Sequence, residues 1–136
     1  MVAVVVIGVV GGWAVGKEFS ARLEQSAASA RASQIERTLK TVAQRVKKTL
    51  PEKLNAVTTM IGISYEQKVM TYVYDLDTRG EAPHEVIATL RELVGERACV
   101  GEFKDAMHYG YAFTFRYNSP RGAKLGEFTL SAANCA

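Results

Sequence analysis

The chain has 136 residues, which is enough for one domain and an appendage and excludes a multidomain enzyme. It is 48% hydrophobic and 23% charged, with a formal net charge of +3. A disordered chain would be less hydrophobic and more highly charged, so most of this chain is expected to fold.

The first sixteen residues contain no charged side chain, and the first charges are at Lys17 and Glu18. As a helix this run would rise about 24 Å, against a hydrocarbon core of about 30 Å. It is therefore the core of a signal peptide, a membrane anchor completed by the residues that follow, or a buried element of the domain core. Cleavage is disfavoured because no positively charged region precedes the run, and we assign residues 1–18 to a membrane anchor or signal-like segment.

Two observations bear on the compartment and point in opposite directions. Lys17 to Lys53 hold nine basic and four acidic residues, and the rest of the chain is net acidic. By the positive-inside rule, these cations would hold the downstream domain in the cytoplasm. The two cysteines, Cys99 and Cys135, follow a predicted helix and the last predicted strand, which is typical of a disulfide that ties a chain terminus to the core.

The alternative for the cysteines is two unrelated buried thiols in a cytosolic protein. We favour the bridge. The prediction is then a single-pass protein of the bacterial inner membrane, with its C-terminal domain in the oxidising periplasm.

Residues 18–50 contain no Gly or Pro and are rich in good helix formers, which predicts one long helix that Pro51 ends. We treat 19–50 as an amphipathic helical stalk. Its apolar stripe follows a 4-3-4-3 spacing through Ala28, Ala32, Ile35, Leu39, Val42, Val46 and Thr49. Either the later turns lie on a sheet, or residues 28–49 join two copies of the chain in a coiled coil whose helix–helix contact is formed by Ile35, Leu39, Val42 and Val46.

Residues 51–136 are predicted to form a small α+β domain. Apolar residues alternate with a period of two in 54–65 and 69–75, so these segments are expected to form a hairpin with a turn at 66–68. Pro83 is expected to begin a helix that ends near Ala98, and a short helix is expected at 102–107.

The clearest strand spans Tyr109 to Tyr117, where aromatic residues occupy every second position. A turn at 118–122 and a last strand from Lys124 to Ser131 follow. The apolar segment and long helix are thus expected to precede a four-stranded antiparallel sheet, in the order ββαββ, with the helices packed on one face.

No motif for catalysis, metal binding or a cofactor is present. The sequence lacks a nucleophile elbow, a phosphate-binding glycine loop and a zinc-protease motif. His84 and His108 have no metal ligand at suitable spacing, and the calcium-like Asp75–Gly80 stretch has Val86 where a bidentate Glu is needed. Nucleic-acid binding is not expected either, because the sheet-bearing half is net acidic. We expect a non-enzymatic protein without cofactors.

The side of the aromatic strand opposite the core is the candidate partner surface. It would be formed by Thr114 and Arg116 together with Glu127 and Thr129 of the next strand, all expected to face solvent.

The stretch from Leu90 to Cys135 shares a series of features with one known family. They are a helix running into Cys99, a short second helix, a strand that starts after Gly110-Tyr111, the alternating aromatic strand, the turn at Gly122 and the terminal Cys135. In these features the chain resembles the small disulfide-bonded pilotins that escort type II secretion secretins, in their α+β form. The resemblance implies the fold and the Cys99–Cys135 bridge, and it transfers no partner-binding residue.

The favoured function is a non-enzymatic, membrane-anchored extracytoplasmic domain that binds another envelope protein as a secretion or assembly accessory. A pilin-like filament subunit is an alternative because of the order of helix, sheet and disulfide. Pilins resemble one another in a glutamate near the mature N-terminus, however, and the first acidic residue here is Glu18. The third alternative is an inhibitor or immunity domain.

Overall fold

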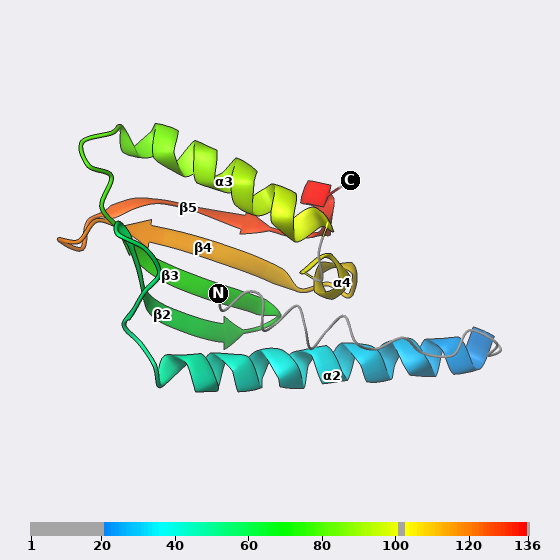
Figure 1. Cartoon of the computed structure of the whole chain (residues 1–136). Coiled ribbons are helices and arrows are strands. Elements are labelled where there is room, and N and C mark those ends of the chain that lie inside the picture. Colours follow the sequence, from blue (N-terminus) through cyan, green and yellow to red (C-terminus); the bar gives the residue numbers. More distant parts are fainter. Residues whose placement is uncertain (1–20, 101–102, 136) are drawn as a thin grey trace.

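The computed structural model describes residues 21–100 and 103–135 (Figure 1). The expected anchor at 1–18 lies outside this range, and no helix within the range is both long and apolar enough to cross a membrane. The elements are, in chain order, α2 (Ala21–Lys47), β1 (Glu52–Lys53), β2 (Thr58–Glu66), β3 (Val69–Leu76), α3 (Pro83–Val100), α4 (Phe103–His108), β4 (Ala112–Asn118), β5 (Lys124–Leu130) and a terminal 3₁₀ turn, η1 (Ala132–Cys135).

The prediction of an α+β fold is confirmed, but the prediction of four antiparallel strands is wrong. The sheet has five strands in the order β1-β2-β3-β4-β5, and β3 pairs with β4 in parallel while the other neighbours are antiparallel. The reason is the connection from β3 to β4, which passes through α3 and α4. A long crossover of this kind returns the chain to the edge where β3 began, so that β4 runs in the same direction.

The fifth strand comes from a turn inside the segment predicted as one strand from Leu54. The side-chain oxygen of Asn55 accepts hydrogen bonds from the backbone N–H groups of Val57 and Thr58, each at 2.9 Å. The backbone N–H of Leu54 also donates to the carbonyl of Thr58 at 2.9 Å. These bonds close a tight turn, so the short β1 folds back on β2.

The aromatic strand begins three residues later than predicted. At the end of α4 the N–H groups of Tyr109 and Tyr111 both donate to the carbonyl of Ala106, and Gly110 has a φ of +93°. This left-handed residue ends the helix in the usual way. Tyr109 and Tyr111 therefore precede β4 and extend toward α2.

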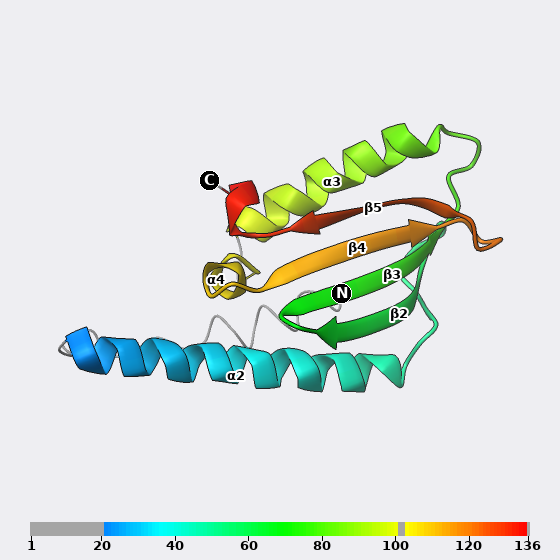
Figure 2. The same ribbon diagram turned by 180° about the vertical axis from the view of Figure 1, so that it is seen from behind.

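The described helices all cover one face of the sheet, with α2 along β2 and α3 along β5 (Figures 1 and 2). On this face, Tyr72 of β3 stacks on Phe115 of β4 with ring centroids 5.2 Å apart, and Phe115 stacks on Phe128 of β5 at 5.3 Å. Phe103 of α4 meets Phe113 edge-on at 4.5 Å. The core therefore contains a row of aromatic rings that runs across β3, β4 and β5 beneath the helices.

The apolar stripe of α2 lies on the sheet of its own chain. Ile35 and Leu39 are 0% exposed, Val42 is buried and Val46 is half-buried. The interpretation in which the later turns lie on a sheet is therefore confirmed. The coiled-coil interpretation fails for these side chains, because they are already buried and offer no surface to a second copy.

The predicted disulfide joins Cys99, in the last turn of α3, to Cys135 at the end of η1, with a Cα–Cα distance of 5.2 Å. It closes a loop that contains α4, β4 and β5. The bond thus ties the C-terminal end of the sheet to the helix that covers it.

Removal of this bond should lower stability through the unfolded state. The double variant Cys99→Ala/Cys135→Ala should lose about 3 to 4 kcal/mol of unfolding free energy, because the unfolded chain regains the freedom of a long loop. Urea denaturation followed by circular dichroism measures the loss, and wild-type protein under reducing conditions should match the variant. A loss below about 1 kcal/mol would contradict the role given to the bond.

Two glycines test how closely α3 packs on β5. A Cβ added at Gly126 would lie 3.0 Å from Cγ1 of Ile87 in α3, whereas one added at Gly95 would meet nothing within 4 Å. Gly126→Val should therefore destabilise the protein by about 1 to 3 kcal/mol. Gly95→Ala, on the solvent side of the same helix, should stabilise it by about 0.5 to 1 kcal/mol. Thermal melts of both variants make the comparison, and equal effects would refute this packing.

Candidate functional site

The side chains that the sequence singled out lie together on the face of the sheet that no described helix covers. Strand pairing aligns Thr71, Thr114 and Thr129 in one row, and it aligns Val73, Arg116 and Glu127 in the next. We call this the open sheet face. The four candidate residues of the partner surface, Thr114, Arg116, Glu127 and Thr129, are all part of it.

The threonine row is less accessible than expected. The hydroxyl oxygens of Thr114 and Thr129 are 2.8 Å apart and share a hydrogen bond, and Thr114 is only 7% exposed. Its strand is flanked on both sides, so Thr71 and Thr129 shield its short side chain. The expectation that Thr114 faces solvent is wrong, whereas Thr129, on the edge strand, is exposed.

The charged row is accessible. Nε of Arg116 lies 3.5 Å from Oε1 of Glu127, the two side chains are 44% and 31% exposed, and Lys124 pairs with the same carboxylate. The pKa of Glu127 is lowered, chiefly by the hydrogen bond from Lys124; burial, the next cause in size, opposes this, and the charges of Lys124 and Arg116 add to the lowering. Exposed pairs of this kind contribute little to stability, so these groups can exchange partners at small cost.

Ile61 is a residue of this region that the sequence analysis missed. It lies in a β-bulge, where the register of β2 against β3 shifts between Met60 and Gly62, and it is 39% exposed. A Cβ added at Gly62 would lie 3.3 Å from Cβ of Val73, so Gly62 also belongs to the open sheet face. A glycine inside a strand often marks a bulge, and this was the available signal.

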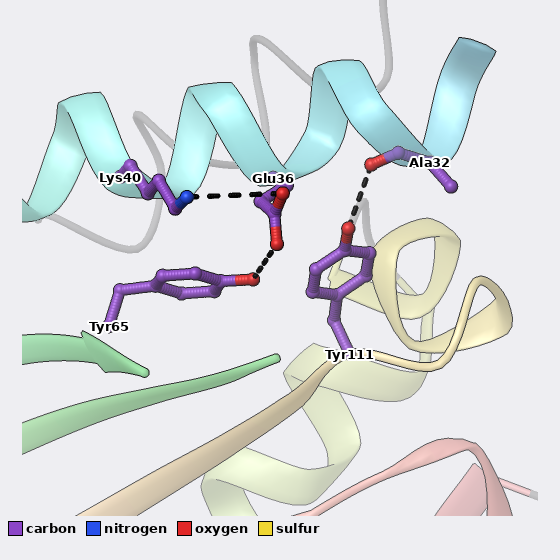
Figure 3. A network of polar contacts seen from close by, with 5 residues as sticks. All are labelled: Ala32, Glu36, Lys40, Tyr65 and Tyr111. Carbon is purple, nitrogen blue, oxygen red and sulfur yellow. Dashed lines mark hydrogen bonds and ion pairs between the residues drawn. The ribbon is translucent and has the colours of Figure 1, made fainter. Parts of the chain in front are cut away.

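On the opposite side of the sheet, a polar network fastens α2 (Figure 3). The hydroxyl of Tyr65 donates to Oε1 of Glu36 at 3.2 Å, and Nζ of Lys40 lies 3.9 Å from the other oxygen of Glu36. The hydroxyl of Tyr111 donates to the carbonyl oxygen of Ala32 at 2.8 Å. Burial, and after it the charge of Glu36, raise the pKa of both tyrosines. Each polar group of this network has a partner within it, so we assign the network a structural role: it holds α2 against the sheet.

Beside the disulfide, an open hollow of about 560 Å³ lies between α3 and the end of β5. It is lined by charged side chains of α3, including Arg91, Glu92 and Glu96, and by Cys99 and Cys135. Both cysteines are bonded to each other, so neither can act as a nucleophile. In the part of the chain that the structure describes, no three His, Cys, Asp or Glu side chains are grouped so that they could hold a metal ion.

No known family profile matches the sequence, and no curated protein matches it. Solved structures do match its fold. The pilotin of the Vibrio vulnificus type 2 secretion system, EpsS, aligns with a TM-score of 0.60 at 18% identity, over 77% of this chain and 94% of its own. The type II secretion pilotin AspS from Vibrio cholerae aligns with a TM-score of 0.59 at 11% identity, over 79% and 99%.

A third match is a candidate secreted protein from Pseudomonas aeruginosa, with a TM-score of 0.64 at 14% identity, over 74% of this chain and 91% of that one. At these identities the likeness shows the fold alone. The resemblance inferred from Leu90 to Cys135 is confirmed at that level, and it extends well beyond this stretch because each match covers most of the chain.

Two tyrosine variants test whether this polar network holds α2 against the sheet. Tyr111→Phe should lower the unfolding free energy by about 1 kcal/mol. It removes the hydrogen bond that joins Tyr111, which directly precedes β4, to the backbone of α2. The hydroxyl of Tyr72 is also buried but has no hydrogen-bond partner in the described structure. Tyr72→Phe is thus a matched control that should leave stability unchanged or raise it. Urea denaturation measures both, and a reversed order would refute the assignment.

Proposed function

We propose that the chain is a non-enzymatic accessory of the bacterial envelope, which binds another envelope protein through its open sheet face. The observation that carries the proposal is the fold, which matches two type II secretion pilotins over at least 94% of their own length. Such an accessory works by binding, and the described surfaces offer charged and polar groups that can bind a partner.

The open sheet face is favoured as the binding surface because of its composition. Val73 contributes an apolar side chain to the row that carries Arg116 and Glu127, and the exposed Ile61 directly precedes Gly62 of the same row. Protein interfaces typically combine an apolar centre with charged groups that select the partner. The ion pair of Arg116 and Glu127 is held loosely, so a partner can replace either member.

The proposal places this domain in the periplasm. The Cys99–Cys135 bond supports that location, because disulfides persist in oxidising compartments. Attachment to the inner membrane through residues 1–18 is part of the proposal and rests on the uncharged sequence before Lys17. The partner to test first is a secretin, in keeping with the resemblance to pilotins.

Site-specific photocrosslinking in the native cells tests the binding surface. A photoreactive residue at Arg116 should form a crosslink to one envelope protein, whereas the same residue at Thr89, exposed on α3, should not. Mass spectrometry of the crosslinked species identifies the partner. Crosslinks of equal strength at both positions, or to cytoplasmic proteins alone, would refute the proposal.

Charge reversal then tests the residues. Arg116→Glu should weaken binding to the captured partner at least about tenfold, because like charges now face each other across the interface and beside Glu127. Arg121→Glu makes the same change in the exposed turn between β4 and β5, and it should leave binding unchanged. Both variants should keep the wild-type melting curve, since exposed ion pairs contribute less than about 1 kcal/mol.

A further inference from the structure

The solvent face of α2 is basic throughout its C-terminal half. Residues 37–51 contain five basic side chains and no acidic one. We define the basic face of α2 by the exposed side chains of this segment of the helix and the residue that follows it: Arg37, Lys40, Thr41, Gln44, Arg45, Lys47 and Lys48.

The basic face of α2 points away from the sheet. Its central positions, 37, 41, 44 and 48, repeat the spacing of the buried stripe at 35, 39, 42 and 46, two residues further along the chain. Two residues of an α-helix correspond to a rotation of about 200°, so the two faces are on opposite sides. The basic face extends about 16 Å along the helix axis.

Most of these charges are not neutralised by neighbours. Within the described residues only Lys40 of this face has an acidic partner, Glu36 at 3.9 Å. Cations in the last turn, such as Lys47, also compensate the helix dipole. That effect does not reach Arg37, which lies more than two turns before the end of the helix. The accumulation of charge therefore exceeds what the helix itself requires.

We propose that the basic face of α2 binds the anionic headgroups of a lipid bilayer. Clusters of Lys and Arg on one helix face are attracted to such headgroups. The face has no aromatic side chain on which a nucleic-acid base could stack. None of its residues lines the hollow beside α3, and a pocket is what usually receives an anchoring side chain of a protein partner.

The sequence before α2 favours the same occupant. The uncharged residues 1–16 are separated from the start of α2 by only four residues, so a membrane contact there would bring α2 close to the headgroups. This inference goes beyond the proposed function, because it concerns a different surface and a different kind of ligand. It requires no particular partner at the open sheet face.

Energy transfer to labelled lipids tests the proposal on the full chain. Thr41→Cys places one reactive thiol at the centre of the basic face, since both native cysteines are bonded to each other. A fluorophore on that thiol should transfer energy more efficiently to headgroup-labelled vesicles rich in phosphatidylglycerol than to vesicles of phosphatidylcholine alone. Attachment through residues 1–18 would act equally on both kinds of vesicle, so the difference reports on the basic face. Added salt should reduce the difference.

Neutralising variants show which residues are responsible. In Arg37→Gln/Arg45→Gln/Lys48→Gln, each lost charge should weaken binding about fivefold, so the half-saturating concentration of anionic lipid should rise about 100-fold. The matched control Arg91→Gln/Arg97→Gln/Arg121→Gln removes three exposed charges elsewhere and should bind like the wild type.

Equal transfer to anionic and neutral vesicles would overturn the proposal, and so would an equal loss in the control. Either result would instead favour an acidic protein as the ligand of the basic face of α2. Failure here is distinct from failure of the proposed function, because crosslinking at Arg116 reports on the open sheet face and should be the same in the neutralised triple variant.

Discussion

The parallel pairing of β3 with β4 is the constraint on which the rest of the structure depends. It brings Tyr72 beside Phe115 and Tyr74 beside Tyr117, with ring centroids 5.2 and 5.0 Å apart. Aromatic rows of this size must be kept from water, and the crossover that makes the strands parallel also carries α3 and α4 onto that face. The disulfide then fixes the end of this crossover to the end of β5.

The one-sided core also decides the character of the other surfaces. Because the apolar stripe of α2 is buried against the sheet, only the polar side of the helix is exposed to solvent, and that side is basic. On the reverse of the sheet, the alternation of β4 and β5 places the Arg116–Glu127 pair where no described helix covers it. Both candidate binding surfaces are therefore consequences of how the interior is filled.

Local patterns in the sequence predicted most elements, and long-range relations accounted for most errors. The alternation of Met70, Tyr72 and Tyr74 and the stripe of Ile35, Leu39 and Val42 reflect burial directly, so strands and helices were recognised. Parallel pairing depends on where a crossover returns, which no local pattern encodes. The turn at Asn55 and the helix end at Gly110 depend on single side chains and on one φ angle, so strand ends shifted.

The candidate site was predicted only in part, again because local patterns were informative and long-range relations were not. A period of two correctly placed Arg116 and Glu127 on one face, but the burial of Thr114 depends on neighbours in two other strands, and the exposure of Ile61 depends on a bulge.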